Sequence, residues 1–282
     1  MKKNPVVAIM YDFDKTLCTK DMQEYSFIPR LGQTAQEFWT KANTLASSQQ
    51  MDGILAYMKV MLDESRARQQ PIRRQDFVSA GGSIEFFAGV PGWFGILNKV
   101  AENLGINLQH FIISSGLKEI IEGSSIAHEF TRIYASEYLY DENGVAVWPK
   151  VAVNYTTKTQ FLFRINKGVE GMGNDSRLNR YTPEEERPIP FRNMIYIGDG
   201  LTDVPCMKLV KVNGGTSIAV HGPGDDSVCQ DLMQQDRINF YAEADYRPES
   251  PLFSLVKRLL EKLAAQNDLE EVYRTQRTLR NR

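Results

Sequence analysis

Val6 to Leu17 reads Val-Val-Ala-Ile-Met-Tyr-Asp-Phe-Asp-Lys-Thr-Leu. The apolar run Val6–Tyr11 predicts a short buried strand, which ends in two carboxylates, Asp12 and Asp14, one residue apart. Because side chains alternate along an extended segment, these two can point the same way. Two close carboxylates at the end of a buried strand repel each other and are costly to desolvate, and a divalent cation would relieve that cost. We therefore expect a functional site here, with Asp12 as its nucleophile.

Length and composition are those of an ordinary globular protein. The 282 residues are 42% hydrophobic and 24% charged, which suffices for a full core and an inserted module. With 33 basic and 35 acidic side chains, the net charge of −2 gives no reason to expect nucleic acid or a membrane surface as a partner. The cysteines, Cys18, Cys206 and Cys229, are widely spaced and predict reduced thiols. No apolar stretch reaches the ~18 residues of a membrane span or has the pattern of a signal peptide, so we expect a cytoplasmic protein.

The segment after the first strand has a helical pattern. Apolar residues recur at helical spacing over 35–46 and 53–68, and Gln69-Gln70-Pro71 ends the second helix. Because no convincing strand interrupts this stretch, residues 20–88 are predicted to form an inserted helical domain. Residues 1–19 and 89–282 would then form the core domain.

Short strands and helices alternate after residue 107. Asp141-Glu142-Asn143-Gly144 predicts a hairpin turn, and the polar stretch Gly168–Arg192 a long surface loop. Alternating elements predict an α/β fold, a doubly wound, mostly parallel, Rossmann-like sheet. Strands are expected over 110–114, 130–135, 194–197, 217–220 and 238–242. Helices are expected over 92–104, 116–123, 156–166, 202–210 and 228–235, and at the C-terminus, where 273–282 would be frayed.

Three polar clusters fall at predicted strand ends. They are Asp12/Asp14, Ser114/Ser115 and Asp199/Asp203. In open α/β sheets, sites form beyond the carboxyl ends of the strands, so these clusters should converge.

The acidic motifs indicate an oxygen-only metal site. Asp-x-Asp-x-Thr alone is a weak signal; a solvated turn has the same residues, and a calcium loop is excluded by Leu17 and Gln23, where Gly and Glu would be needed. Gly198-Asp199-Gly200-Leu201-Thr202-Asp203 follows another apolar strand, and Asp199 supplies a third carboxylate suited to Mg²⁺. Asp203, one helical turn later, supports that site or simply complements the helix dipole.

A phosphate site is indicated beside these carboxylates. Ser114 ends a predicted strand, and Ser115 precedes a predicted helix start, so hydroxyl and backbone N–H groups would form a phosphate pocket; Ser115 could equally be an ordinary helix cap. A cation is also needed there. Lys158, at a helix start, is our candidate and Lys150 its competitor; spacing alone does not separate them.

Together these motifs resemble the four ordered motifs of the haloacid dehalogenase-like hydrolases. The motifs are Asp12 to Leu17, the strand ending in Ser114, Lys158, and Gly198 to Asp203, and they span most of the chain. The helical insert 20–88 resembles the cap domain of the phosphoserine-phosphatase-like branch.

The resemblance implies a mechanism and a role for each motif residue. It implies a magnesium-dependent phosphatase acting on a small-molecule phosphomonoester through an aspartyl-phosphate, with Asp12 as nucleophile and Asp14 as general acid/base. It also implies phosphoryl binding by Ser114 and Lys158, with Ser115 beside them. Mg²⁺ would be held by Asp12, the backbone carbonyl of Asp14 and Asp199, with Asp203 in support.

Departures from the family pattern bear on the substrate. Asp21 stands where phosphoserine phosphatases usually carry Glu, Thr202 where they carry Asn, and Ser115 where they carry Gly. Asp21 is therefore a candidate substrate contact, but phosphoserine specificity does not follow. The alternatives are a phosphotransferase of the same fold and a catalytically silent phosphate-binding scaffold. The insert also holds four arginines that could meet a substrate carboxylate or lie exposed: Arg66, Arg68, Arg73 and Arg74.

Overall fold

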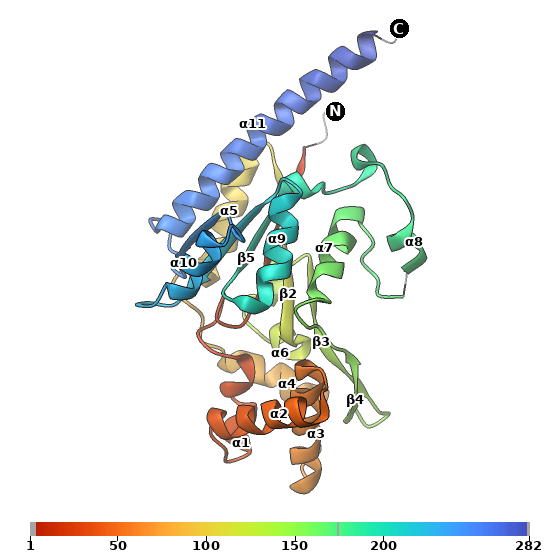
Figure 1. Cartoon of the computed structure of the whole chain (residues 1–282), viewed down its shortest axis with the longest axis vertical. Helices are drawn as coiled ribbons and strands as arrows, with labels where there is room; N and C mark the ends of the chain where they lie inside the picture. Colours follow the sequence, from red (N-terminus) through yellow and green to blue (C-terminus); the bar gives the residue numbers. More distant parts are fainter. Residues whose placement is uncertain (1–3, 174, 281–282) are drawn as a thin grey trace.

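The computed structural model describes residues 4–173 and 175–280, and it contains a seven-stranded sheet in the order β4-β3-β2-β1-β5-β6-β7 (Figure 1). Every adjacent pair is parallel except β3 and β4, which form the predicted antiparallel hairpin. This confirms the α/β prediction and puts β1, with Asp12 after it, at the centre of the sheet. The strands are β1 (Val6–Tyr11), β2 (Asn107–Leu117), β3 (Arg132–Tyr140), β4 (Ala146–Val151), β5 (Met194–Gly198), β6 (Thr216–His221) and β7 (Phe240–Glu243).

Helices cover both faces of the sheet. In β1, Val7, Ile9 and Tyr11 face one apolar cluster and Ala8 and Met10 the other, and none of these side chains is exposed. The first cluster includes residues of α5 and α11, and the second residues of α7, α9 and α10 (Figure 1). Burial on both faces explains why the strand is continuously apolar. These helices are α5 (Val90–Asn103), α7 (Lys158–Lys167), α9 (Val204–Val212), α10 (Ser227–Gln234) and α11 (Pro251–Arg280).

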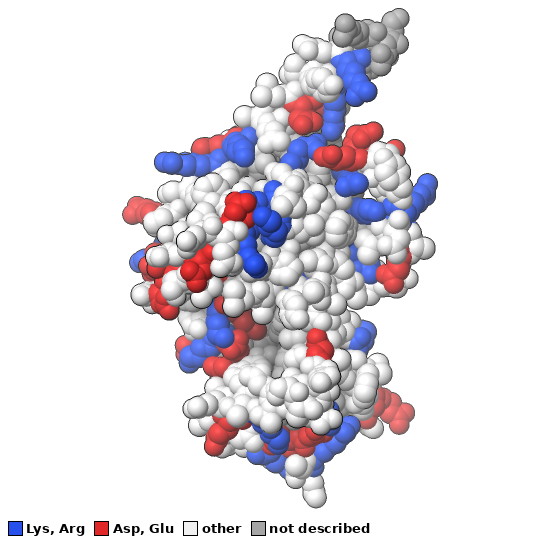
Figure 2. Space-filling view, viewed as in Figure 1, with Lys and Arg blue, Asp and Glu red and all other residues white. Residues whose placement is uncertain are grey.

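The segment between β1 and α5 forms a separate helical lobe below the sheet (Figure 1). Its surface is indented where it meets the sheet-bearing part of the molecule (Figure 2). The lobe packs on the β3–β4 hairpin: the Tyr138 hydroxyl donates to the Met58 carbonyl at 2.7 Å, and the Tyr138 ring stacks on Phe77. The lobe therefore lies next to the carboxyl end of the sheet. Its helices are α1 (Phe27–Arg30), α2 (Ala35–Gln49), α3 (Gly53–Ala67) and α4 (Arg74–Ala80).

The helix expected over 116–123 is wrong at its start. β2 continues to Leu117, where it pairs with Ser136 of β3, and the helix α6 (Lys118–Glu122) begins only afterwards. Position 116 is a glycine because the Met22 side chain occupies the space of a Cβ; a Cβ there would lie 2.1 Å from Met22 Cε. Ser115 is consequently not a helix cap.

Two further expectations need correction. The predicted surface loop Gly168–Arg192 also contains a short helix, α8 (Asp175–Asn179). The tail expected to fray after Tyr273 is helical through Arg280, as part of α11; residues 281–282 lie outside the described residues. In the described part of the chain, no helix has both the length and the apolar character to cross a lipid bilayer.

Candidate active site

Asp12 lies at the carboxyl end of the central strand, and its carboxylate is almost fully buried. Its backbone N–H donates to the Ile197 carbonyl at 2.9 Å, so the end of β1 is tied to the end of β5. The chain then turns: the Phe13 carbonyl accepts from the N–H groups of Leu17 and Cys18, and Lys15 adopts a left-handed conformation with φ 55°. Hydrogen bonds within the turn thus satisfy part of its backbone as the chain leaves the edge of the sheet.

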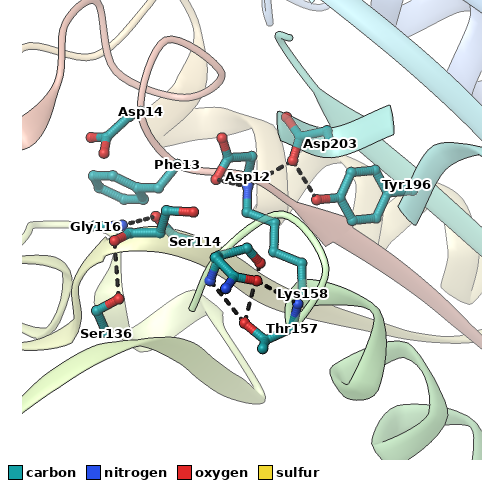
Figure 3. A network of polar contacts seen from close by, with 12 residues as sticks. Asp12, Phe13, Asp14, Ser114, Gly116, Ser136, Thr157, Lys158, Tyr196 and Asp203 are labelled. Carbon is teal, nitrogen blue, oxygen red and sulfur yellow. Dashed lines mark hydrogen bonds and ion pairs between the residues drawn. The ribbon is translucent and has the colours of Figure 1, made fainter. Parts of the chain in front are cut away.

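Lys158 is the cation of this site. Its ammonium is fully buried and lies 3.0 Å from Asp12 Oδ1 and 2.7 Å from Asp203 Oδ1 (Figure 3). Burial alone would lower the pKa of Lys158, but the two carboxylates outweigh it and raise that pKa. Lys150, the competing candidate, is exposed on the hairpin and pairs with Glu137 at 2.9 Å. The structure thus brings Lys158, and not Lys150, to the aspartates.

Asp203, expected only to support the metal site, is fixed by two buried hydrogen bonds. Its Oδ1 accepts from the Lys158 ammonium and from the Tyr196 hydroxyl, each at 2.7 Å (Figure 3). Its Oδ2 packs against Gly198, where an added Cβ would lie only 2.5 Å away. Gly198 is therefore small because the Asp203 side chain fills the space beside it. Tyr196 was missed from sequence, although a lone hydroxyl in an apolar strand signals a buried partner.

Asp12, Asp199 and Asp203 form the one cluster of the described residues whose ligand atoms could hold a metal ion, all within 4.8 Å of one another. Asp203 Oδ2 is buried and makes no hydrogen bond within the described chain, and Asp12 Oδ1 has the Lys158 ion pair as its one described contact. Carboxylate oxygens at this spacing, with no nitrogen or sulfur ligand among them, fit a hard divalent cation such as Mg²⁺. Burial first, and the neighbouring Asp203 second, raise the pKa of Asp12 to about 7 and that of Asp199 well above its usual range.

The Asp14 carboxylate lies outside this cluster and faces the helical lobe. Its Oδ1 accepts from the Met22 N–H at 2.8 Å, and the side chain points away from Lys158 (Figure 3). Burial, with Asp21 and then Asp12 adding repulsion, raises the pKa of Asp14 well above its usual range. The two aspartates of the motif thus differ in environment: Asp12 faces the cation and Asp14 faces the lobe.

Ser114 and Ser115 also differ in their surroundings. Ser114 is fully buried, and its Oγ accepts from the Gly116 N–H at 3.0 Å, which leaves the hydroxyl hydrogen for another acceptor. Ser115 contributes its backbone: its carbonyl accepts from the Tyr57 hydroxyl at 2.8 Å and from Ser136 Oγ at 3.1 Å. Of the two serines, Ser114 therefore offers a buried hydroxyl and Ser115 a backbone carbonyl.

Asp21 and the four arginines of the lobe, all considered as substrate contacts, lie in different places. Asp21 is partly exposed and pairs with Lys15 at 2.7 Å, beside Asp14 and Asp199. The arginines lie elsewhere: Arg68 pairs with Glu64 and Arg74 with Glu122, while Arg73 donates to the carbonyl of Asn143. Arg66 is exposed at the end of α3. The contacts of Arg68, Arg73 and Arg74 thus lie within the lobe, at the β3–β4 turn and at α6, whereas Asp21 lies beside Asp14.

A largely buried aspartate cluster with one buried lysine, at the carboxyl end of a parallel sheet next to a helical insert, defines an α/β protein with an acidic, oxygen-lined centre. The chain belongs to the haloacid dehalogenase-like hydrolases, because the family model matches residues 9–208. This confirms the family that the sequence motifs indicated, and with it the hydrolase class.

Similar solved structures have the fold of the expected branch. A substrate-bound phosphoserine phosphatase superposes with a TM-score of 0.55 at 14% identity, covering 92% of this chain and 99% of that one. A probable phosphoserine phosphatase from Vibrio cholerae gives 0.56 at 12% identity, covering 94% and 67%. An uncharacterized protein of Borreliella burgdorferi is 26% identical over 283 residues, covering 90% of this chain and 96% of the relative.

Proposed function

We propose that the protein is a magnesium-dependent phosphatase that hydrolyses a small-molecule phosphomonoester through an aspartyl-phosphate on Asp12. The observation that carries the proposal is the placement of Lys158, which lies between Asp12 and Asp203 while the buried Asp203 Oδ2 has no hydrogen bond within the described chain. A carboxylate can attack an anionic phosphoryl group only where positive charge offsets the repulsion.

Asp12, Asp199 and the backbone carbonyl of Asp14 would hold Mg²⁺, with Asp203 in support. When bound, the ion supplies positive charge that adds to that of Lys158 beside the phosphoryl oxygens. Lys158 binds a phosphoryl oxygen and holds Asp12 in place, and Ser114 donates its free hydroxyl hydrogen to another oxygen. Asp12 attacks phosphorus, and the bond from phosphorus to the leaving oxygen breaks.

Asp14 is the proton donor and acceptor in this proposal. Its Oδ1 is occupied by the Met22 N–H, so Oδ2 carries the proton to the leaving alcohol. The same carboxylate then takes a proton from the water that hydrolyses the aspartyl-phosphate. A dehalogenase has no need of this acid, which favours phosphate-ester chemistry.

The helical lobe, residues 20–88, is proposed to act as a cap domain that admits the substrate to the site. Asp21 is paired with Lys15 and lies beside Asp14, so we propose that Asp21 contacts the alcohol part of the substrate. We place the enzyme in the cytoplasm with a small metabolite as its partner, and the three free, buried cysteines support this location.

The test is hydrolysis of p-nitrophenyl phosphate and a panel of metabolite phosphates, with Mg²⁺ and with EDTA. We expect metal-dependent turnover that Asp12→Asn abolishes, together with acid-stable labelling of wild type by a phosphoryl donor. Asp63→Asn is the matched control, because it removes the same charge from an exposed residue paired only with Lys59 in the contacts described. Equal, metal-independent rates in wild type and Asp12→Asn would contradict the proposal.

Added alcohols distinguish the rival functions. If phosphate appears on the alcohol and not on water, the protein is a phosphotransferase. If phosphates raise the melting temperature but no panel member is turned over, it is a binding scaffold.

A further inference from the structure

Helix α3 of the lobe contacts both segments that carry the proposed phosphate-binding residues, the end of strand β2 and the loop before α7. The Tyr57 hydroxyl of α3 donates to the carbonyl of Ser115, next to Ser114, at 2.8 Å. Asp52, the residue that caps the start of α3, accepts at Oδ2 from the Asn154 side-chain amide at 2.7 Å. Asn154 belongs to the loop that leads into Lys158. One helix of the lobe therefore reaches two separate parts of the site.

Asn154 organises the turn that begins α7. Its Oδ1 accepts from the N–H groups of Thr156 and Thr157 at 3.0 and 2.8 Å, and its backbone carbonyl accepts from the Lys158 N–H at 2.8 Å. The amide oxygen of Asn154 thus binds its own loop while the amide nitrogen binds Asp52. Because Lys158 is the first residue of α7, the placement of this turn determines where its side chain starts.

Ser136 of β3 links the segment that holds Ser115 to the loop that holds Asn154. Its Oγ donates to the Ser115 carbonyl and accepts at 3.0 Å from the N–H of Val153, the residue directly before Asn154. The contacts therefore form a closed circuit from α3 through the ends of β2 and β3 to the Lys158 loop and back. Such a circuit is complete only while the lobe lies against the core.

We propose that Asp52 and Asn154 are positioning residues that couple docking of the helical lobe to the placement of Lys158. The inference rests on the proposed function, since the coupling acts on catalysis through Lys158. With the lobe docked, the Asn154 turn is fixed from both sides and the Lys158 ammonium lies between Asp12 and Asp203. Without the contact the turn keeps its own hydrogen bonds but loses its anchor to the lobe.

The side-chain pair allows an exchange experiment. Asp52 uses Oδ1 to cap Ile54 and Leu55 and uses only Oδ2 on Asn154, so Asp52→Asn keeps the cap and turns an N–H₂ group toward the Asn154 amide. Asn154→Asp keeps the acceptor for its loop and opposes two carboxylates. In the double variant, amide and carboxylate have simply changed places. Both single variants should therefore lose the contact and the double variant should regain it.

The first readout is hydrogen exchange of the peptide covering 152–160, which requires no turnover. We expect each single variant to exchange about tenfold faster there, and the double variant to approach wild type. The second readout is kcat and KM for the best panel substrate. Each single variant should lose about tenfold in kcat, and the double variant should recover to within about twofold of wild type. Asp63→Asn, on the same helix, should change neither readout.

The outcomes separate the two proposals. If wild type turns over no phosphate ester, the proposed function fails, but the exchange pattern still tests the coupling. If exchange in the single variants matches wild type, or if the double variant is no better than either single, the positioning role is overturned. Circular dichroism at the assay temperature shows that each variant is folded, so a loss confined to the single variants is not a loss of fold.

Discussion

Tyr196→Phe tests the buried hydrogen bond that holds Asp203. The change removes one hydroxyl, which donates to Asp203 Oδ1 at 2.7 Å, and leaves the ring in a fully buried position. The phenyl ring fills the same space, so no cavity is created. The experiment therefore isolates the hydrogen bond from packing.

The expected loss of stability follows from the charge of the acceptor. A hydrogen bond to a charged group contributes roughly 1.5–3 kcal/mol, against about 1 kcal/mol for a neutral pair. Asp203 keeps Lys158 as its other donor at 2.7 Å, so the carboxylate is not left unpaired and the larger cost of a buried orphan charge does not apply. We expect the free energy of unfolding to fall by about 2 kcal/mol.

Tyr134→Phe supplies the matched control. Tyr134 is also buried, lies in the neighbouring part of the same apolar cluster, and stacks on Phe161, but its hydroxyl makes no hydrogen bond within the described chain. Its removal should cost about 0 kcal/mol or stabilise slightly. Urea unfolding of both variants measures the difference. Equal losses in the two variants would refute the assignment of Tyr196 to Asp203.

Three further variants probe the same region and the core. Gly198→Ala should lower the free energy of unfolding by about 1–3 kcal/mol, because its Cβ would lie 2.5 Å from Asp203 Oδ2. Gly200→Ala, whose Cβ would meet nothing within 4 Å, should lower it far less. Similar melting temperatures for the two variants would contradict this packing. Burial lowers the pKa of His110 to about 3, so its neutral form is favoured by folding and stability is lost as pH falls below about 6.5. By about pH 5 the loss is ~2 kcal/mol, and His110→Gln should flatten the stability profile over that range; an unchanged profile would exclude His110 as its source. Lys158→Met leaves two buried carboxylates without their cation and should cost about 3–5 kcal/mol and reduce turnover by at least ~100-fold, as measured by urea unfolding and initial rates; wild-type activity in a folded variant would contradict its role.

The fold could be predicted because apolar strands alternate with helices along the chain. The edge of the sheet where the acidic residues meet follows from the same pattern. Apolar strands that end in polar residues determine which residues share an edge of a parallel sheet, and Asp12, Asp199 and Asp203 meet there. The helices 53–68 and 35–46 were predictable for the same reason, since their apolar spacing is regular. Local pattern and global fold agree in these elements.

The rest depended on contacts between segments far apart in the chain. Ser115 was expected at a helix start because the apolar run Phe111-Ile112-Ile113 ends at Ser114, but pairing with β3 extends β2 to Leu117. The choice of Lys158 over Lys150 required the position of α7 relative to β1. The sequence did not indicate a functional role for Asn154. Asn-Tyr-Thr-Thr is typical of an ordinary turn, and the side chain that Asn154 binds is 102 residues away.

The charges at the centre of the site explain why a lysine and a metal ion are both expected there. Asp12, Asp199 and Asp203 carry three negative charges when ionised, and Lys158 carries one positive charge, so the cluster has a formal charge of −2 in a largely buried space. Lys158 is already shared between Asp12 and Asp203, which leaves Asp199 without a cation at hydrogen-bond distance in the contacts described. An incoming phosphoryl group would add further negative charge. A divalent cation would balance this arrangement, and because Lys158 also binds Asp203, the lysine alone does not neutralise the cluster.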